Sequence, residues 1–282
     1  MAFGYQILGF GAKAVLPPYT RATGGTVTVD GNYKIHAFTG DENFVVTNVG
    51  DDDATVDYVI IAGGGAGSWY DGNNGGGGGG GGGYRGSDST FTGNPMDNPG
   101  GQITLSGEGS IAVVVGNGGS ISGTLAGPNP GGASSIAFPS ALSSTGGGQG
   151  FGSNGGSGGG GMPTNPGGGS GNTPPFSPFP QGNNGGTSPG ATSPYPSRNG
   201  GGGGGAGGGG GQPAAGAGIG VTITGSPVTK AAGGVGDPSG SGGVGGANTG
   251  DAGSGGGTSG APREGPAHAG GSGYVAIRYL YK

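Results

Sequence analysis

The sequence changes character within one stretch, Thr55-Val56-Asp57-Tyr58-Val59-Ile60-Ile61-Ala62-Gly63-Gly64-Gly65-Ala66-Gly67. Its first part is rich in β-branched and aromatic residues, which is the composition of a strand. Its second part consists of glycine and alanine, and each glycine in a helix interior costs about 1 kcal/mol relative to alanine. The stretch therefore predicts an apolar strand, suited to the centre of a sheet, that leads directly into a segment without α-helix.

Three further strand-like segments precede this stretch. Residues 26–29, 33–38 and 43–49 are short, contain β-branched or aromatic residues, and are separated by Asp-Gly or Gly-Asp turns. Such spacing is typical of hairpin connections. We therefore predict that these three segments form a β-meander.

Strand-like segments also occur far along the chain. Residues 102–106 and 110–115 flank a Gly-Glu-Gly turn and predict a hairpin. The chain ends in an apolar strand at residues 274–281. We expect this strand to pair with residues 55–62, because these are the two most apolar strands and neither has a local partner of equal length.

Glycine dominates the rest of the chain. Of 282 residues, 87 are glycine and 21 are proline, a combined share above the roughly 25–30% that normally signals low complexity or disorder. However, the charged fraction is 8% and the net charge is −5, whereas disordered chains usually combine low hydrophobicity with high net charge. Composition leaves order and disorder both open, and we favour order because the tracts return repeatedly to apolar segments such as residues 134–138 and 221–224.

The glycine tracts require backbone pairing if they are ordered. A polyproline-II helix has three residues per turn and suits glycine, but a lone helix of this kind leaves its N–H and C=O groups unpaired. Several packed side by side can pair with one another. The tracts are residues 63–86, 116–132, 146–171, 199–220 and 233–273.

These patterns predict a fold that is mostly β plus irregular structure, with essentially no α-helix. A small β-sheet frame or sandwich, built from residues of about 26–62, 102–115 and 274–281, would hold a packed bundle of polyglycine-II helices. The bundle would comprise residues of about 63–101 and 116–273. We expect two domains, an N-terminal arm at residues 1–23 and a glycine-rich domain at residues 24–282.

The N-terminal arm differs in composition from everything that follows it. Phe3, Tyr5 and Ile7 alternate with the period of a strand, and Leu8 and Phe10 add further apolar surface. Such a strand could add to the sheet edge of another subunit. We therefore take these five residues as docking candidates; the alternative is a strand that packs into its own β frame.

Several function classes are excluded or disfavoured by the sequence. There are no cysteines and nine Lys and Arg residues, so we expect no thiolate metal site and no nucleic-acid binding. The N-terminus lacks a basic segment and no run reaches 18 apolar residues, so neither a signal peptide nor membrane insertion is expected. Residues 59–68 imitate a dinucleotide-binding turn, but the glycines that follow prevent the helix that such a site needs.

Catalytic and metal sites find no support in the sequence. His36 and His268 are far apart, and we interpret His36 as a surface residue of a strand. Residues 51–53 are three aspartates that could bind calcium, although a solvated turn is the simpler interpretation. No nucleophile has an evident base beside it. We expect no enzyme activity and no cofactor.

Aromatic residues near the glycine tracts are the candidate contacts. Phe176, Phe179 and Tyr195 lie in proline-rich segments, which lower the cost of ordering an exposed ring. Trp69, Tyr70 and Tyr84 flank the first glycine tract. All six could contact a receptor, or they could close the ends of the glycine bundle.

The order of several motifs along the chain resembles that of a known family. It runs from Tyr33-Lys34-Ile35-His36-Ala37-Phe38-Thr39 through the Ile-Ala-Gly-Gly-Gly run and Gly-Gly-Tyr84-Arg85 to Gly271-Ser272-Gly273-Tyr274-Val275-Ala276-Ile277-Arg278-Tyr279. This order resembles the glycine-rich domain of bacteriophage tail fibre and receptor-binding (adhesin) proteins with polyglycine-II helices. The resemblance implies a place at the virion surface, on the tail or the capsid exterior, and a role in host attachment.

The partners implied are other virion proteins and a host cell-surface receptor, either protein or glycan, with a homo-oligomer also open. Two other functions stay open. One is a purely architectural virion subunit, such as a capsid decoration or tail component. The other is an ice-binding protein, which the large Pro/Phe/Tyr loops and the missing secretory signal disfavour.

Overall fold

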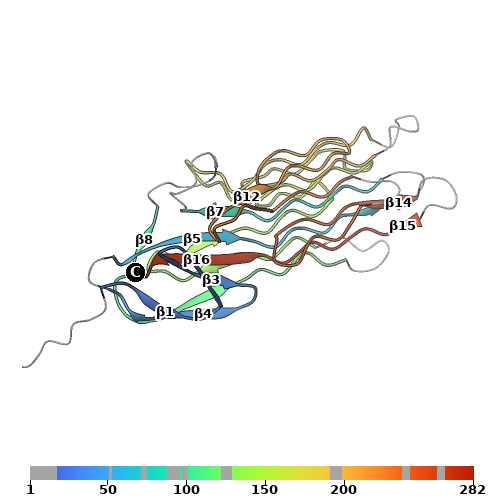
Figure 1. The fold of residues 1–282 in the computed structure, drawn as a ribbon. Helices are drawn as coiled ribbons and strands as arrows, with labels where there is room; N and C mark the ends of the chain where they lie inside the picture. The colour runs from blue at the N-terminus through green and yellow to red at the C-terminus, as the bar shows by residue number, and fades with distance from the viewer. Residues whose placement is uncertain are drawn as a thin grey trace, which may run out of the picture.

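The structure is a computed structural model, and it describes residues 18–50, 53–70, 75–87, 96, 101–121, 129–190, 199–236, 242–258 and 264–282. None of these residues is in an α-helix, and the chain forms several β-sheets. The molecule is elongated, with the longer strands at one end and the glycine-rich segments running from them to the other end (Figure 1). The expectation of a mostly β fold without α-helix is confirmed.

The first sheet contains the most buried strands of the protein. Its order is β2 (Thr26–Asp30), β3 (Tyr33–Phe38), β16 (Tyr274–Leu280), β5 (Thr55–Ile61) and β7 (Tyr84–Gly86), and β8 (Ile103–Thr104) pairs with the other end of β5. Strand β16 is antiparallel to β5, with Tyr274 opposite Ile61 and Arg278 opposite Asp57. The predicted pairing of the C-terminal strand is therefore confirmed.

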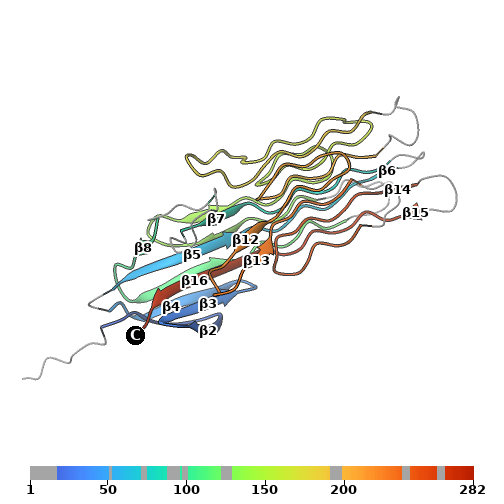
Figure 2. The ribbon, with the colours of Figure 1, turned by 45° about the horizontal axis from the view of Figure 1, so that its top comes forward.

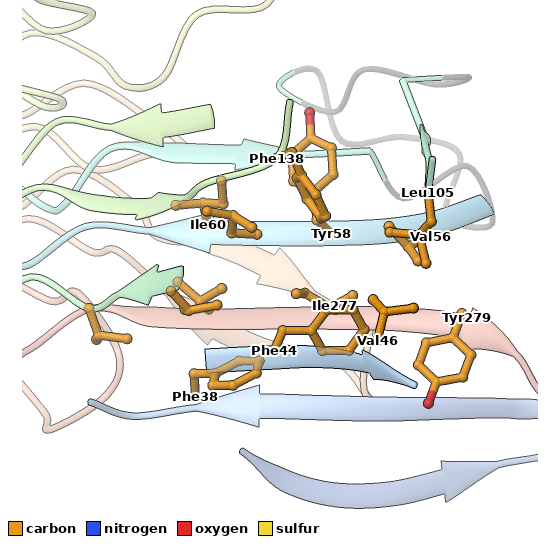
Figure 3. Packing of buried hydrophobic residues seen from close by; sticks show 14 residues of the cluster. Phe38, Phe44, Val46, Val56, Tyr58, Ile60, Leu105, Phe138, Ile277 and Tyr279 are labelled. Atoms are coloured by element: carbon orange, nitrogen blue, oxygen red, sulfur yellow. The ribbon is translucent and has the colours of Figure 1, made fainter. Parts of the chain in front are cut away.

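The second sheet faces the first. Its order is β1 (Arg21–Thr23), β4 (Glu42–Asn48), β9 (Gly109–Val114), β10 (Ser134–Ile136) and β11 (Leu142–Ser144). The larger core lies between the two sheets, and Figure 3 shows members of it, among them Tyr58, Phe44 and Ile277. The β part of the molecule is thus a sandwich.

Both faces of β5 are buried, which explains its continuous apolar sequence. Tyr58 and Ile60 point into the core between the two sheets. Val59 and Ile61 point to the opposite face, into a smaller core that includes Ile219. This second core lies under a hairpin of β12 (Ile219–Val221) and β13 (Val228–Lys230).

The predicted meander is wrong in part, and the predicted hairpin is wrong. Strands β2 and β3 form the expected hairpin, but β4 leaves them to pair with β1 and β9 in the second sheet. Strands β8 and β9 do not pair with each other, since β8 joins β5 and β9 joins β4. In both cases the chain crosses between the two sheets, because burying two apolar faces against each other requires strands in both layers.

The predicted domain boundaries also shift. Residues 21–23, expected in the N-terminal arm, form β1 of the second sheet, while residues 1–17 lie outside the described residues. Strands β10, β11, β12 and β13 fall within residues 116–273, the range expected to be glycine bundle. These strands are three residues long each, which is below the length that makes a clear strand signal.

The glycine tracts pair through their backbones with a period of three residues. Gly63 N–H donates to Gly132 O (2.9 Å), and Ala66 N–H, three residues later, donates to Asn129 O (3.1 Å) of the same neighbouring segment. The other donors of this tract continue the pattern: Gly64 and Gly67 donate to Gly271 and His268, and Gly65 and Ser68 donate to Gly80 and Gly77. Successive residues therefore bond to three different neighbours.

A second tract, residues 76–83, repeats this arrangement. Its donors at Gly76, Gly79 and Gly82 bond to the carbonyls of Gly256, Gly253 and Gly250. A three-residue period is the period of the polyproline-II helix. The expected pairing between tracts is present, and the polyglycine-II conformation itself stays a prediction that this period supports.

Glycine is required where tracts approach one another. A Cβ atom at Gly203 would lie 1.7 Å from the carbonyl oxygen of Gly79, and one at Gly79 would lie 2.2 Å from that of Gly65. Real Cβ atoms essentially never approach other heavy atoms within 3.0 Å. The close packing of backbones therefore leaves these positions no room for any side chain.

Candidate binding sites

The predicted aromatic contacts fall into three different environments. Trp69 and Tyr70 form β6 (Trp69–Tyr70), which pairs in parallel with β14 (Gly256–Thr258), and β14 pairs with β15 (Glu264–Gly265). This small sheet lies at the end of the molecule opposite the C-terminus (Figure 2). Both side chains are half-buried, so each ring presents part of its surface at that end.

Tyr84 is placed differently. It lies opposite Ile61 in the first sheet and is 2% exposed within the smaller core. A ring this buried offers no surface to a receptor. The structure thus gives Tyr84 a packing role, and the alternation of a strand directs the next side chain, Arg85, to the other face of the sheet.

Phe176 and Phe179 lie in a loop that is held by one asparagine. The Oδ1 atom of Asn172 accepts hydrogen bonds from the backbone N–H groups of Phe176 (3.0 Å) and Gln181 (3.1 Å). The Nδ2 atom of Asn172 donates back to the Phe176 carbonyl (3.1 Å). One side chain therefore closes the loop at both of its ends.

Gln181 joins this loop to the β frame. Its side chain is fully buried, accepts from Thr145 N–H (2.8 Å) and donates to the Pro174 carbonyl (3.0 Å). Its own carbonyl accepts from the Tyr84 N–H of β7 (2.8 Å). Because buried polar groups are costly when unpaired, this network fixes the loop beside β7.

A cavity of about 160 Å³ lies between this loop and β7. Its lining combines aromatic and polar side chains: Tyr58, Arg85, Gly86, Met96, Phe176, Ser177, Pro178 and Phe179. The guanidinium carbon of Arg85 lies 4.4 Å from the centre of the Phe176 ring, and its Nη1 atom donates to the Ser143 carbonyl (3.2 Å). We call this cavity the Phe176 pocket.

Tyr58 contributes a hydroxyl group to the Phe176 pocket. The residue is 2% exposed, and its backbone is fixed by Ser87, whose Oγ accepts from Tyr58 N–H (2.8 Å). Among the described residues, no hydrogen bond to the Tyr58 hydroxyl is present. Burial raises the pKa of this hydroxyl, against the opposing effect of the Arg85 charge, so the group is a protonated donor at neutral pH.

Sequence reasoning had no means to select Tyr58 and Arg85. Arg85 follows Tyr84 in the motif that carried the resemblance, but Tyr58 was recognised as a strand residue without a site role. The two meet because β5 and β7 are paired neighbours, with Ile60 opposite Arg85. Phe176 lies 91 residues beyond Arg85 in the sequence, so no local pattern reports their contact.

His36 is fully buried, and its interpretation as a surface residue is wrong. Its Nδ1 lies 2.6 Å from the Gly24 carbonyl, which can only accept, so Nδ1 carries the hydrogen. Nε2 then accepts from the Tyr279 hydroxyl at 3.0 Å, and that hydroxyl accepts from Ala22 N–H at 3.1 Å. Burial lowers the pKa of His36 and raises that of Tyr279 to about 12, so both groups are neutral and structural.

A buried ion pair joins the two long strands of the first sheet. Arg278 Nη2 lies 3.1 Å from Asp57 Oδ2, and the Arg278 guanidinium stacks on Tyr33 with 4.8 Å to the ring centre. Ser87 Oγ donates to the other carboxylate oxygen, Asp57 Oδ1 (3.2 Å). The pair is satisfied on several sides and fixes the register of β16 on β5.

The aspartates at residues 51–53 were the candidates for a metal site in the sequence. Of the three aspartates at residues 51–53, Asp53 is described, and its Oδ1 accepts from the N–H and hydroxyl of Thr55 (2.8 and 2.6 Å) as in a turn. Within the described ranges, no group of three or more potential metal-ligating side chains is present, nor any helix long and apolar enough to cross a bilayer.

The remaining predicted residues lie outside the described part of the chain. These are the receptor candidate Tyr195 and the docking candidates Phe3, Tyr5, Ile7, Leu8 and Phe10.

The comparisons with known proteins agree with the glycine-rich architecture. A family model described as a glycine-rich domain matches residues 39–280. No curated protein matches the sequence. The matched range covers the sandwich from the end of β3 to β16 and all the described glycine tracts.

Proposed function

We propose that this chain, which belongs to the glycine-rich domain family, is a bacteriophage virion protein of tail fibre or adhesin type that exposes loops for host attachment. The observation that carries the proposal is the backbone-paired body, which holds aromatic residues at fixed places on a protein surface. An attachment protein needs such rigidity, because ordering a flexible loop at the moment of binding reduces affinity.

The position of Trp69 and Tyr70 supports this function. They stand at the end of the molecule away from the C-terminus, on a short sheet that continues a hydrogen-bonded tract. Aromatic side chains contribute most of the binding energy in many interfaces. An elongated body that presents two aromatic rings at one end is suited to reach a receptor on a cell surface.

The partners in this proposal are other virion proteins and a host receptor, and the location is the virion surface. Because residues 21–23 form β1, the docking arm in this proposal is residues 1–17. It would dock to another subunit through the alternating Phe3, Tyr5 and Ile7 and the adjoining Leu8 and Phe10. A homo-oligomer formed through the same arm is part of the same proposal. The test is a chain that lacks residues 1–17. This chain should stay folded and should no longer be incorporated into particles.

Attachment is tested directly by incubating the labelled full chain with a panel of bacterial strains. We expect adsorption to a subset of strains and a loss of at least about tenfold for Trp69→Ala, the range expected for a hot spot of 1.4 kcal/mol or more. Val228→Ala is the control, since Val228 is an exposed apolar residue on β13. Equal adsorption of both variants, or adsorption to every strain, would count against specific attachment through β6.

A purely architectural virion subunit is the second candidate function. The observation that favours it is strand β2, which is the outer strand of the first sheet and is exposed at all five residues. Val27 and Val29 on this strand are 47% and 54% exposed. An exposed edge with apolar side chains is a template for pairing with another subunit, and such a subunit would assemble into particles without adsorbing to cells.

A further inference from the structure

We infer that the Phe176 pocket binds a sugar ring that carries a carboxylate. The inference rests on the proposed attachment function for its biological setting, because a receptor glycan is one of the partners of that proposal. The binding chemistry depends only on the groups that line the pocket.

The size of the pocket limits the ligand. At about 160 Å³ the cavity is smaller than the roughly 300–1,000 Å³ of sites that enclose drug-sized molecules. A single six-membered ring is the appropriate scale. A larger glycan would place one residue in the pocket and leave the rest of its chain in solvent.

The lining has one apolar side and one polar side. Phe176, Phe179 and Pro178 supply the apolar surface, whereas Arg85, Ser177 and the hydroxyl of Tyr58 supply polar groups. A sugar ring has the same division, with C–H groups on its faces and hydroxyl groups on its rim. An aliphatic ligand would leave the polar side unpaired, which costs binding energy.

Arg85 selects for a carboxylate. Its guanidinium is stacked on Phe176 and uses one donor on the Ser143 carbonyl, and a guanidinium has five N–H donors. Within the described part of the chain, the ion pair present is that of Arg278 with Asp57, so no described carboxylate neutralises Arg85. A stacked guanidinium with remaining donors matches the two oxygens of a carboxylate.

The Tyr58 hydroxyl is the second polar anchor. It belongs to a residue that is 2% exposed and lines the pocket, and no described group accepts its hydrogen. A hydroxyl that lines a pocket and bonds to no described group can donate to a bound ligand. A carboxylate or ring oxygen of the ligand would accept this hydrogen bond.

The pocket is also preorganised. Asn172 and Gln181 hold the loop that carries Phe176 and Phe179, through hydrogen bonds of 2.8–3.1 Å to both ends of the loop and to β7. Tyr58 and Arg85 lie on the paired strands β5 and β7. The ligand therefore binds groups that are already in place, which reduces the entropic cost of binding.

The experiment compares glucuronic acid with glucose, which differ by the carboxylate, in binding to the full chain measured by ligand-observed NMR titration. We expect glucuronic acid to bind at least about tenfold more tightly, in line with a hydrogen-bonded charge contact. Arg85→Gln should remove this preference, and Tyr58→Phe should weaken glucuronic acid by roughly tenfold or more. Arg21→Gln, which removes an exposed positive charge on β1, should leave the preference intact.

Each result decides the inference. Equal affinity for the two sugars, absence of binding to both, or a preference that survives Arg85→Gln would overturn it, provided that the variants keep the melting temperature of the parent chain. If Arg85→Gln or Tyr58→Phe lowers the melting temperature, Phe179→Leu, a change in the apolar wall of the pocket, replaces it. Unchanged glucuronic acid binding by that variant would overturn the pocket. Adsorption to cells that persists without any sugar preference would leave the attachment function standing and reject this ligand.

Discussion

Replacing Gly79 by alanine should destabilise the protein far more than the same change at an exposed glycine. A Cβ atom at Gly79 would lie 2.2 Å from the Gly65 carbonyl oxygen, where at least 3.0 Å is needed. The segment around Gly65 must then move by close to 1 Å. That segment is a hydrogen-bonded part of the body, with Gly65 N–H bonded to Gly80 O at 2.8 Å and Gly65 O bonded to Gly253 N–H at 3.0 Å.

The magnitude follows from three contributions. Overpacking a filled site costs about 1–3 kcal/mol, and weakening two hydrogen bonds costs about 0.5–1.5 kcal/mol each. The lower entropy of the unfolded alanine chain returns about 0.4–1 kcal/mol. We expect a net loss of about 1–5 kcal/mol in the free energy of unfolding. A loss of about 3 kcal/mol, in the middle of this range, corresponds to a fall in melting temperature of roughly 6–12 °C.

Gly167 is the matched control. A Cβ atom there would meet nothing within 4 Å, and the residue is exposed. Gly167→Ala should therefore be neutral or stabilise by up to about 1 kcal/mol. Thermal unfolding followed by circular dichroism or calorimetry would compare the two variants, and indistinguishable melting temperatures would refute the close packing of the glycine tracts.

Three further predictions concern the sandwich. Arg278→Met should cost about 3–5 kcal/mol because it leaves the buried Asp57 carboxylate without its partner, and adding Asp57→Asn should recover part of the loss in chemical denaturation; a single variant as stable as the parent would show that the pair is dispensable. Because burial lowers the pKa of His36 below its unfolded value of 6.5, the unfolded state binds the proton more readily, so stability should be full above pH 6.5 and fall as the pH is lowered through that value. His36→Gln should flatten this part of the profile, and an unchanged slope between pH 7 and 5 would assign it to other groups. Deleting residues 273–282 removes β16 from between β3 and β5 and should abolish soluble folding, an expectation that a cooperative melt of the truncated chain would contradict.

Local chemistry accounts for the parts of the fold that the sequence predicted correctly. The run of apolar residues at Val59-Ile60-Ile61 requires burial on both faces, and β5 is indeed covered on both. The absence of a helical period in the glycine tracts excluded α-helix, and the described residues contain none. The β2–β3 hairpin followed from its Asp-Gly turn, with Asp30 opposite Tyr33.

Long-range pairing explains where sequence reasoning failed. Strand β4 continues the meander in sequence, yet Phe44 buries its ring against Tyr279 and His36 across the sandwich. His36 was assigned to the surface because a polar residue next to Ile35 suggests an outward face. The partners that bury it, Gly24 and Tyr279, are 12 and 243 residues away.

The sequence by itself determined the class of the protein: a glycine-rich chain without cysteine, with a few apolar strands, whose tracts must pair through their backbones because they have no side chains to bury. Composition and local pattern suffice for this, since they report what each segment can and cannot form. Tertiary structure alone decided which strands share a sheet, that Tyr84 is buried, and that Tyr58, Arg85 and Phe176 line one cavity. The physical reason is that backbone hydrogen bonds between glycine tracts are the same for every pair of tracts, so the choice of neighbour depends on the whole packed body.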